Sequence, residues 1–88
     1  MALAIIEAEY IKDYKIKVVF SDKKKSTIDF QPFLNQALNP MTRKFLDITE
    51  FKKFKIEYGD LIWNDYEMCF PIIDLYENDL FKNLSPAA

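Results

Sequence analysis

The strongest constraint on the fold is an alternation of side-chain type in residues 14–20, interrupted only by Val19. Apolar side chains occupy every second position, at Tyr14, Ile16, Val18 and Phe20. Successive side chains of a β-strand point to opposite faces of the sheet, so this period of two predicts a strand with one buried face. β-Branched and aromatic residues dominate the run, which is typical of a strand.

The residues on either side predict two more strands. Residues 6–10 alternate between apolar and acidic side chains, which indicates a half-buried strand. After the polar stretch Ser21-Asp22-Lys23-Lys24-Lys25, residues 27–30 resume a strand-like composition, so residues 14–30 are expected to form a hairpin. Three consecutive strands with short connections predict an antiparallel meander.

A short helix is expected after the third strand. Pro32 ends that strand because it has no N–H group to donate, and it suits a first helical position. Apolar residues then follow at helical spacing. The helix is expected to stop before Asn39-Pro40, because the residue that precedes a proline avoids the helical conformation.

Residues 46–54 carry the signals of a second short helix of about two turns. Asp47 is a suitable N-cap, and Glu50 lies three residues later, as in a capping box. Leu46 and Phe51 have the spacing of a hydrophobic staple. A helix of this length is marginal alone, so packing has to hold it.

The only glycine of the chain predicts a tight hairpin. Residues 54–58 alternate again, and Gly59-Asp60 separates them from Leu61-Ile62-Trp63. A glycine at the first turn position predicts a type II′ turn. A last strand is expected within residues 66–70, and a short helix or turn within residues 71–80.

These elements predict a single α+β domain over residues 1–88. An antiparallel sheet of about five strands, a β-meander plus a hairpin, is expected to pack against one or two short helices. The ordered core is expected to cover about residues 4–80, with residues 81–88 as a frayed tail. The expected core side chains are Ile6, Tyr14 or Ile16, Val18, Phe20, Phe30, Leu34, Phe51, Ile56, Leu61 and Trp63.

The residue inventory removes several kinds of chemistry. The chain has no histidine, which excludes a Ser-His-Asp triad, a histidine base and histidine metal ligands. Its single cysteine, Cys69, excludes an internal disulfide and a cysteine-based zinc cluster, and is expected to be a small buried residue. The net charge of −2 gives no general attraction to nucleic acid or to an anionic membrane.

No targeting or membrane segment is expected. The apolar start of the chain is short, lacks a basic residue and meets Glu7, which does not fit a signal peptide. No run approaches the roughly 20 apolar residues of a membrane span. The expected location is therefore the cytoplasm, without membrane contact.

One candidate binding site is the stretch Trp63-Asn64-Asp65-Tyr66-Glu67. In the favoured interpretation, Trp63 is a core residue and a polar turn follows it, because large aromatic side chains mostly pack inside. In the alternative interpretation, the stretch is a binding rim. Trp63 and Tyr66 would then offer flat surfaces, and Asp65 and Glu67 would offer hydrogen-bond acceptors.

A second candidate site consists of two groups of lysines. Brought together by the fold, they would form a phosphate-binding patch. Lysine is also common on exposed turns and edge strands, so a solvated surface is the favoured interpretation. The six residues are Lys23, Lys24, Lys25, Lys52, Lys53 and Lys55.

The acidic residues of the C-terminal half are expected to be solvated or to cap helices. They lack the spacing of a calcium loop, so no metal ligand and no catalytic residue is assigned to them. These residues are Asp60, Asp65, Glu67, Asp74, Glu77 and Asp79.

Three segments resemble a known family, the small bacterial and phage-associated proteins of domain-of-unknown-function family twenty-four forty-two. The first segment is Tyr14 to Phe20 together with Asp29-Phe30-Gln31-Pro32-Phe33-Leu34. The second is Asp47-Ile48-Thr49-Glu50-Phe51, which leads into Lys55-Ile56-Glu57-Tyr58-Gly59. The third is Leu61-Ile62-Trp63-Asn64 together with Leu75-Tyr76. The resemblance implies a compact α+β domain without an assigned activity. It also implies a protein partner, because members are often encoded beside another small protein in an arrangement like a toxin–antitoxin pair.

The leading functional hypothesis is a non-catalytic protein-interaction module without a cofactor. Its partner is expected to be another protein or a second copy of the chain, since the aromatic surplus supplies interface anchors. The first alternative is a nucleic-acid-associated regulatory protein that uses the lysines. The second is an enzyme that depends on carboxylates or a metal.

Overall fold

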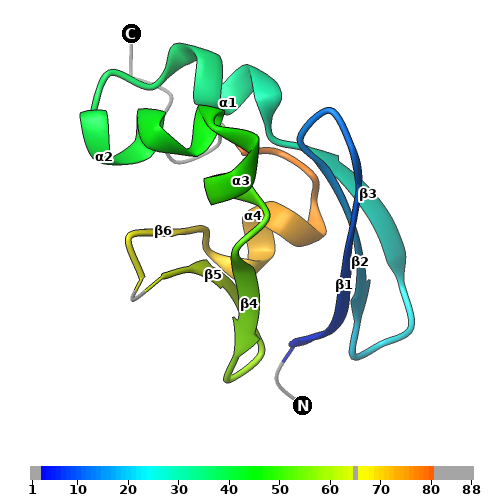
Figure 1. Ribbon diagram of the computed structural model, residues 1–88. Coiled ribbons are helices and arrows are strands. Elements are labelled where there is room, and N and C mark those ends of the chain that lie inside the picture. The colour runs from blue at the N-terminus through cyan, green and yellow to red at the C-terminus, as the bar shows by residue number, and fades with distance from the viewer. Residues whose placement is uncertain (1–2, 65, 81–88) are drawn as a thin grey trace, which may run out of the picture.

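Two three-stranded antiparallel sheets lie side by side in the computed structural model, which describes residues 3–64 and 66–80 (Figure 1). Sheet A has the order β1-β2-β3 and sheet B the order β4-β5-β6. The α+β class, the meander and the hairpin are therefore confirmed. The prediction of one sheet with about five strands is corrected to six strands in two sheets within the described residues. The strands are β1 (Ile5–Lys12), β2 (Lys15–Phe20), β3 (Lys25–Asp29), β4 (Phe54–Glu57), β5 (Asp60–Trp63) and β6 (Met68–Cys69).

Short helices connect the sheets and cover their shared interior (Figure 1). Three short α-helices and one 3-10 helix lie between β3 and β4, and one helix follows β6 within the described residues. None of the described helices is long and apolar enough to cross a membrane. The helices are α1 (Gln31–Gln36), α2 (Pro40–Arg43), the 3-10 helix η1 (Lys44–Leu46), α3 (Ile48–Phe51) and α4 (Ile72–Tyr76).

The predicted positions of the helices are confirmed, but the predicted length and capping box of α3 are wrong. Helix α1 starts in the expected place and ends before Asn39. Asp47 caps α3 by accepting a hydrogen bond from the Thr49 amide at 2.9 Å. Helix α3 is one turn rather than two. Glu50 does not complete the expected capping box, because its carboxylate binds Lys53 at 2.8 Å while the Asp47 amide donates to the Lys44 carbonyl.

The β4–β5 turn differs from the predicted type. Its two central residues are Tyr58 and Gly59, with φ of 52° and 82°, and positive φ at both positions is the mark of a type I′ turn. The turn therefore begins one residue earlier than the sequence indicated. The β1–β2 hairpin uses the same device, with φ of 49° at Asp13 and 65° at Tyr14.

Gly59 also brings the two sheets together. Its carbonyl accepts a hydrogen bond from the Ile5 amide at 2.8 Å, which links the start of β1 to the tip of the β4–β5 hairpin. A Cβ atom at Gly59 would lie 2.7 Å from the Cβ of Ala4, a distance that real Cβ contacts do not reach. Only glycine therefore fits this position on both backbone and steric grounds.

The core is centred on Trp63, which is fully buried. Its indole ring lies 5.4 to 6.3 Å, centroid to centroid, from five phenylalanine rings, which are those of Phe30, Phe45, Phe51, Phe54 and Phe70. Aromatic side chains each bury a large area, so this cluster gives a short chain an efficient core.

Two of the expected core residues are wrong. Ile6 is half exposed, because a β-bulge between Ile5 and Glu7 shifts the register and turns Ile5 inward instead. Ile56 is 37% exposed because it lies on the edge strand β4. Tyr14 packs against the core while partly exposed, and the remaining predicted core side chains are buried.

Candidate interaction surface

The residues of the predicted binding rim do not form one surface, because Trp63 points into the protein. The Trp63 side chain faces the interior, and its Nε1 donates a hydrogen bond to the Phe51 carbonyl at 2.7 Å. It therefore cannot offer a flat surface to a partner, and its place is the one that the favoured interpretation expected. Asp65 lies outside the described residues.

Asn64 and Glu67 serve the turn itself. The Nδ2 of Asn64 donates to the Glu67 carboxylate at 3.0 Å, and the Lys44 ammonium forms an ion pair with the same carboxylate. Hydrogen bonds from Lys44 and then Asn64 lower the pKa of Glu67 below its usual range. The Oε1 atom of Glu67 is thus engaged within the chain, and its two contacts tie the turn after β5 to η1.

Among the described members of the stretch, Tyr66 remains available. It is 47% exposed and has a φ of 62°. Desolvation raises the pKa of the Tyr66 hydroxyl, and the negative charges of Glu57 and Asp60 raise it further. The hydroxyl of Tyr66 is therefore within the electrostatic reach of the β4–β5 hairpin.

The outer face of sheet B carries the two acids that act on the Tyr66 hydroxyl. The cross-strand pairs Glu57–Asp60 and Ile62–Cys69 lie on the face opposite Trp63, since side chains alternate along each strand. Ile62 is fully buried on this face although it does not belong to the main core cluster. Cys69 is exposed rather than buried as predicted, because its side chain points to the outer face of a short edge strand.

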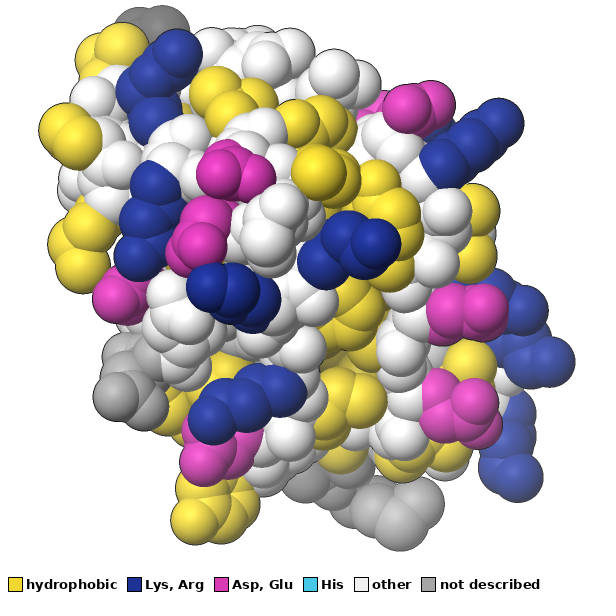
Figure 2. All heavy atoms as spheres, in the orientation of Figure 1, with side chains coloured by type: hydrophobic (Ala, Val, Ile, Leu, Met, Phe, Trp, Pro, Cys, Tyr) yellow, Lys and Arg dark blue, Asp and Glu magenta, His cyan; other side chains and the backbone are white. Residues whose placement is uncertain are grey.

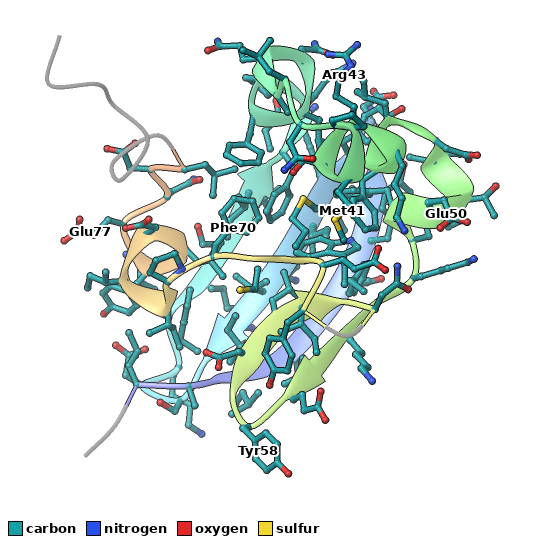
Figure 3. The ribbon with its side chains drawn as sticks, turned by 90° about the vertical axis from the view of Figure 1, so that its left-hand side faces the viewer. Met41, Arg43, Glu50, Tyr58, Phe70 and Glu77 are labelled. Carbon is teal, nitrogen blue, oxygen red and sulfur yellow. The ribbon has the colours of Figure 1, made fainter. Side chains whose placement is uncertain are left out.

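Tyr58 completes this surface, and the sequence analysis did not single it out. Its side chain is 92% exposed and projects from the tip of the β4–β5 hairpin, away from the body of the protein (Figure 3). Tyr58, Tyr66, Glu57 and Asp60 are together called the Tyr58–Tyr66 face. The signal that points to Tyr58 is a Tyr-Gly pair in a two-residue hairpin, where Asn-Gly or Asp-Gly is usual.

The structure does not bring the two lysine groups together. Lys24 lies in the β2–β3 turn, where its ammonium donates to the Tyr76 carbonyl at 2.8 Å. Lys52 lies over the ring of Tyr10, near the other end of β2. The stretch of β2 from Ile16 to Phe20 separates the two groups by roughly 13 Å at about 3.3 Å per residue.

Nearby acids also neutralise part of the second group. Lys53 binds Glu50 at 2.8 Å, a contact that raises the pKa of Lys53, and Lys55 lies 3.9 Å from Glu57. On the face shown in Figure 2, basic and acidic side chains of the described residues are interspersed. The geometry therefore favours the solvated-surface interpretation of the lysines over a single phosphate-binding patch.

The acidic residues show one departure from expectation. Asp74, predicted to be solvated or capping, is 2% exposed and lies in the first turn of α4. In the part of the chain that the structure describes, no three His, Cys, Asp or Glu side chains are grouped so that they could hold a metal ion.

A shallow hollow lies on the outer face of sheet A. Its volume is about 130 Å³, and it is open to solvent. The walls carry both signs of charge, and this mixture does not select a ligand class. The lining residues are Glu7, Ala8, Glu9, Lys17, Val19 and Lys25.

Comparison with protein families identifies the chain. A search of the curated proteins and a search of the solved structures found no match. The model of one family, described as "Protein of unknown function (DUF2442)", matches residues 5–81, which span every strand and helix described above. The chain therefore belongs to this family of proteins of unknown function.

Proposed function

We propose that this chain is a non-catalytic, cytoplasmic protein-interaction module that binds its partner through the Tyr58–Tyr66 face. The observation that carries the proposal is the conformation of Tyr58. A bulky aromatic residue is held at positive φ and is almost entirely exposed. Such a backbone conformation costs on the order of 1 kcal/mol for a residue other than glycine or asparagine.

Tyr14 has the same backbone strain as Tyr58, but it has contacts that compensate for it. Tyr14 also has positive φ, but its hydroxyl donates to the Leu46 carbonyl and its ring packs edge-on against Phe51 at 5.3 Å. These contacts offset the strain at Tyr14. Tyr58 is too exposed for compensation of that size from the described residues, which supports a role in binding.

The chemistry of the face suits a protein partner. Tyrosine combines a large apolar ring with a polar tip and loses little conformational entropy on binding, so it is frequent at interface hot spots. Glu57 and Asp60 lie opposite each other at the base of the turn that carries Tyr58, and they add carboxylate acceptors to this hairpin. Basic and amide groups of a partner would bind there.

The family resemblance supports a specific kind of partner. We propose a small protein encoded next to this chain, in an arrangement like a toxin–antitoxin pair. The two lysine groups lie apart, so nucleic-acid binding has less support.

The test is affinity capture from the lysate of the host, with the wild-type chain and two variants compared side by side. Tyr58→Asn removes the ring and relieves the turn. Leu38→Asn removes another highly exposed apolar side chain, 91% exposed between α1 and α2. A stoichiometric partner that is retained by wild type and by Leu38→Asn and lost by Tyr58→Asn is expected. A partner retained equally by all three, or no partner at all, would contradict the proposal.

A further inference from the structure

Among the described residues no strand pairs with the outer edge of β3, and this edge has a defined set of outward-pointing backbone groups. The amide of Phe20 donates to the carbonyl of Lys24, and the amide of Phe30 donates to the carbonyl of Tyr14. In an antiparallel ladder, hydrogen-bonded pairs alternate with non-hydrogen-bonded pairs. Counting from either end, the backbone groups of Lys25, Thr27 and Asp29 therefore point away from β2.

An independent contact supports this assignment. The Nδ2 of Asn78, just beyond α4, donates to the Thr27 carbonyl at 3.3 Å. That carbonyl could not reach Asn78 if it were pointing into the β2–β3 ladder. The contact is long and exposed, so its net contribution to stability is small.

The side chains of the same three residues lie on the outer face of sheet A. Lys25, Thr27 and Asp29 are exposed, whereas Ile28 is fully buried. A positive and a negative side chain thus stand at equal distances on either side of Thr27. This arrangement is complementary to itself when the strand is turned end for end.

We propose that β3 pairs with β3 of a second copy of this chain, antiparallel and with the two-fold axis at Thr27. Lys25 then lies opposite Asp29 of the second copy, and Thr27 lies opposite its own counterpart. At each of these positions the outward backbone groups of both strands exchange hydrogen bonds. Opposite charges directly across an antiparallel pair, and a central Thr–Thr pair, both stabilise such a pairing.

The other edges of the two sheets are less suited to this pairing. β1 carries two register irregularities, which disrupt an edge, and it lies beside β4 in the fold (Figure 1). β6 has only two residues. β4 is regular too, but it is shorter than β3 and lies beside β1, so β3 is the edge that fits a second copy.

The dimer would leave the surface proposed above for a protein partner exposed. β3 belongs to sheet A, whereas the Tyr58–Tyr66 face lies on sheet B (Figure 1). The two proposals are therefore independent, and a result that contradicts one of them does not contradict the other.

The test uses charge reversal and measures molar mass by light scattering over a range of protein concentrations. Wild type is expected to show a dimer that forms as concentration rises. Lys25→Asp and Asp29→Lys each place like charges across the axis and are expected to remain monomers over the same range. Mixing the two variants pairs opposite charges again at both positions, so the mixture is expected to form a heterodimer.

Two further measurements test the dimer if one of these variants does not fold. Asp29 Oδ1 also accepts a hydrogen bond from the Gln31 amide, so Asp29→Lys could fail to fold. In that case the salt response of Lys25→Asp decides. Salt screens charge, so it should weaken the wild-type dimer but promote dimer formation by Lys25→Asp, whose like charges repel. Asn78→Ala, which frees the Thr27 carbonyl, is expected to raise the dimer fraction.

Several results would overturn the proposal. A wild-type chain that stays monomeric at every concentration excludes the dimer. Single variants that dimerise like wild type exclude this register. A mixture of folded single variants that stays monomeric excludes the Lys25–Asp29 pairing. Identical salt responses of wild type and Lys25→Asp exclude it as well.

Discussion

The indole of Trp63 is tied to the carbonyl of Phe51 by a buried hydrogen bond of 2.7 Å. This bond joins β5 to the last residue of α3, and it satisfies the one polar atom that the Trp63 side chain brings into the core. The helices between the sheets are each one or two turns long, so they depend on such tertiary contacts for their stability.

Replacing Trp63 with phenylalanine tests the importance of this bond. The substitution removes the donor, leaves the Phe51 carbonyl without it, and opens a space among the surrounding rings. We expect a loss of about 2–4 kcal/mol in the free energy of unfolding, from the cavity and the lost hydrogen bond together. Chemical denaturation followed by circular dichroism measures it. Phe54→Leu, at a partly exposed position beside the same indole, is a control expected to lose less.

The sequence predicted those parts of the fold that depend on local patterns. Period-two alternation located β2, and the N-cap signal located the start of α3 at Asp47. It failed where a long-range contact decides the conformation. The bulge that turns Ile5 inward instead of Ile6 occurs where β1 also meets Gly59, 54 positions along the chain. No pattern within residues 5–12 indicates such a contact.

The candidate surface was predicted only in part, for a related reason. Tyr66 belonged to the proposed rim, but Tyr58 did not, because the predicted type II′ turn began at Gly59 and left Tyr58 at the end of a strand. The observed type I′ turn places Tyr58 at the tip of the hairpin, at a positive φ that is unusual for tyrosine. Phe45 was missed as well, since α2 and η1 are single turns without a periodic signal.

Gly59→Ala is expected to destabilise the protein through two effects. The residue has a φ of 82°, and its added Cβ would lie 2.7 Å from the Cβ of Ala4. Together these effects should cost about 2 kcal/mol or more in the free energy of unfolding. The double variant Ala4→Gly/Gly59→Ala relieves the steric contact but not the backbone strain. Partial recovery in a double-mutant cycle is therefore expected, and additive losses would show that the close approach to Ala4 does not matter.

Tyr58→Asn should stabilise the protein while it impairs binding. Asparagine adopts positive φ at lower cost and is favoured in type I′ turns before glycine. Since the Tyr58 side chain is 92% exposed, little packing is lost. A gain of about 0.5–1 kcal/mol in the free energy of unfolding is expected, measured by thermal and chemical denaturation. Tyr58→Phe keeps the strain and the ring, so its stability should stay near wild type. A destabilised Tyr58→Asn variant would mean that the ring has contacts that offset its strain.

Stability below pH 4 should depend on the contact between Asp22 and Tyr76. The Tyr76 hydroxyl donates to the Asp22 carboxylate at 2.5 Å, which joins the β2–β3 turn to α4. This hydrogen bond is the largest cause of a lowered Asp22 pKa, and the Lys24 amide is the next. Because the folded pKa lies below the ordinary value of 3.8, the contribution of Asp22 to stability is present above that value and is lost as the pH falls through the folded pKa.

Tyr76→Phe isolates this effect. It removes the hydroxyl and keeps the ring, which packs against Phe20 at 5.0 Å and lies under the Lys24 ammonium. The pKa of Asp22 should move back toward its ordinary value in the variant. The variant should therefore lose less stability than wild type between about pH 4 and the lower folded pKa. Denaturation midpoints measured across this range, with Asp22→Asn as a matched control, check it. Parallel acid profiles for wild type and Tyr76→Phe would show that the hydroxyl does not set the Asp22 pKa.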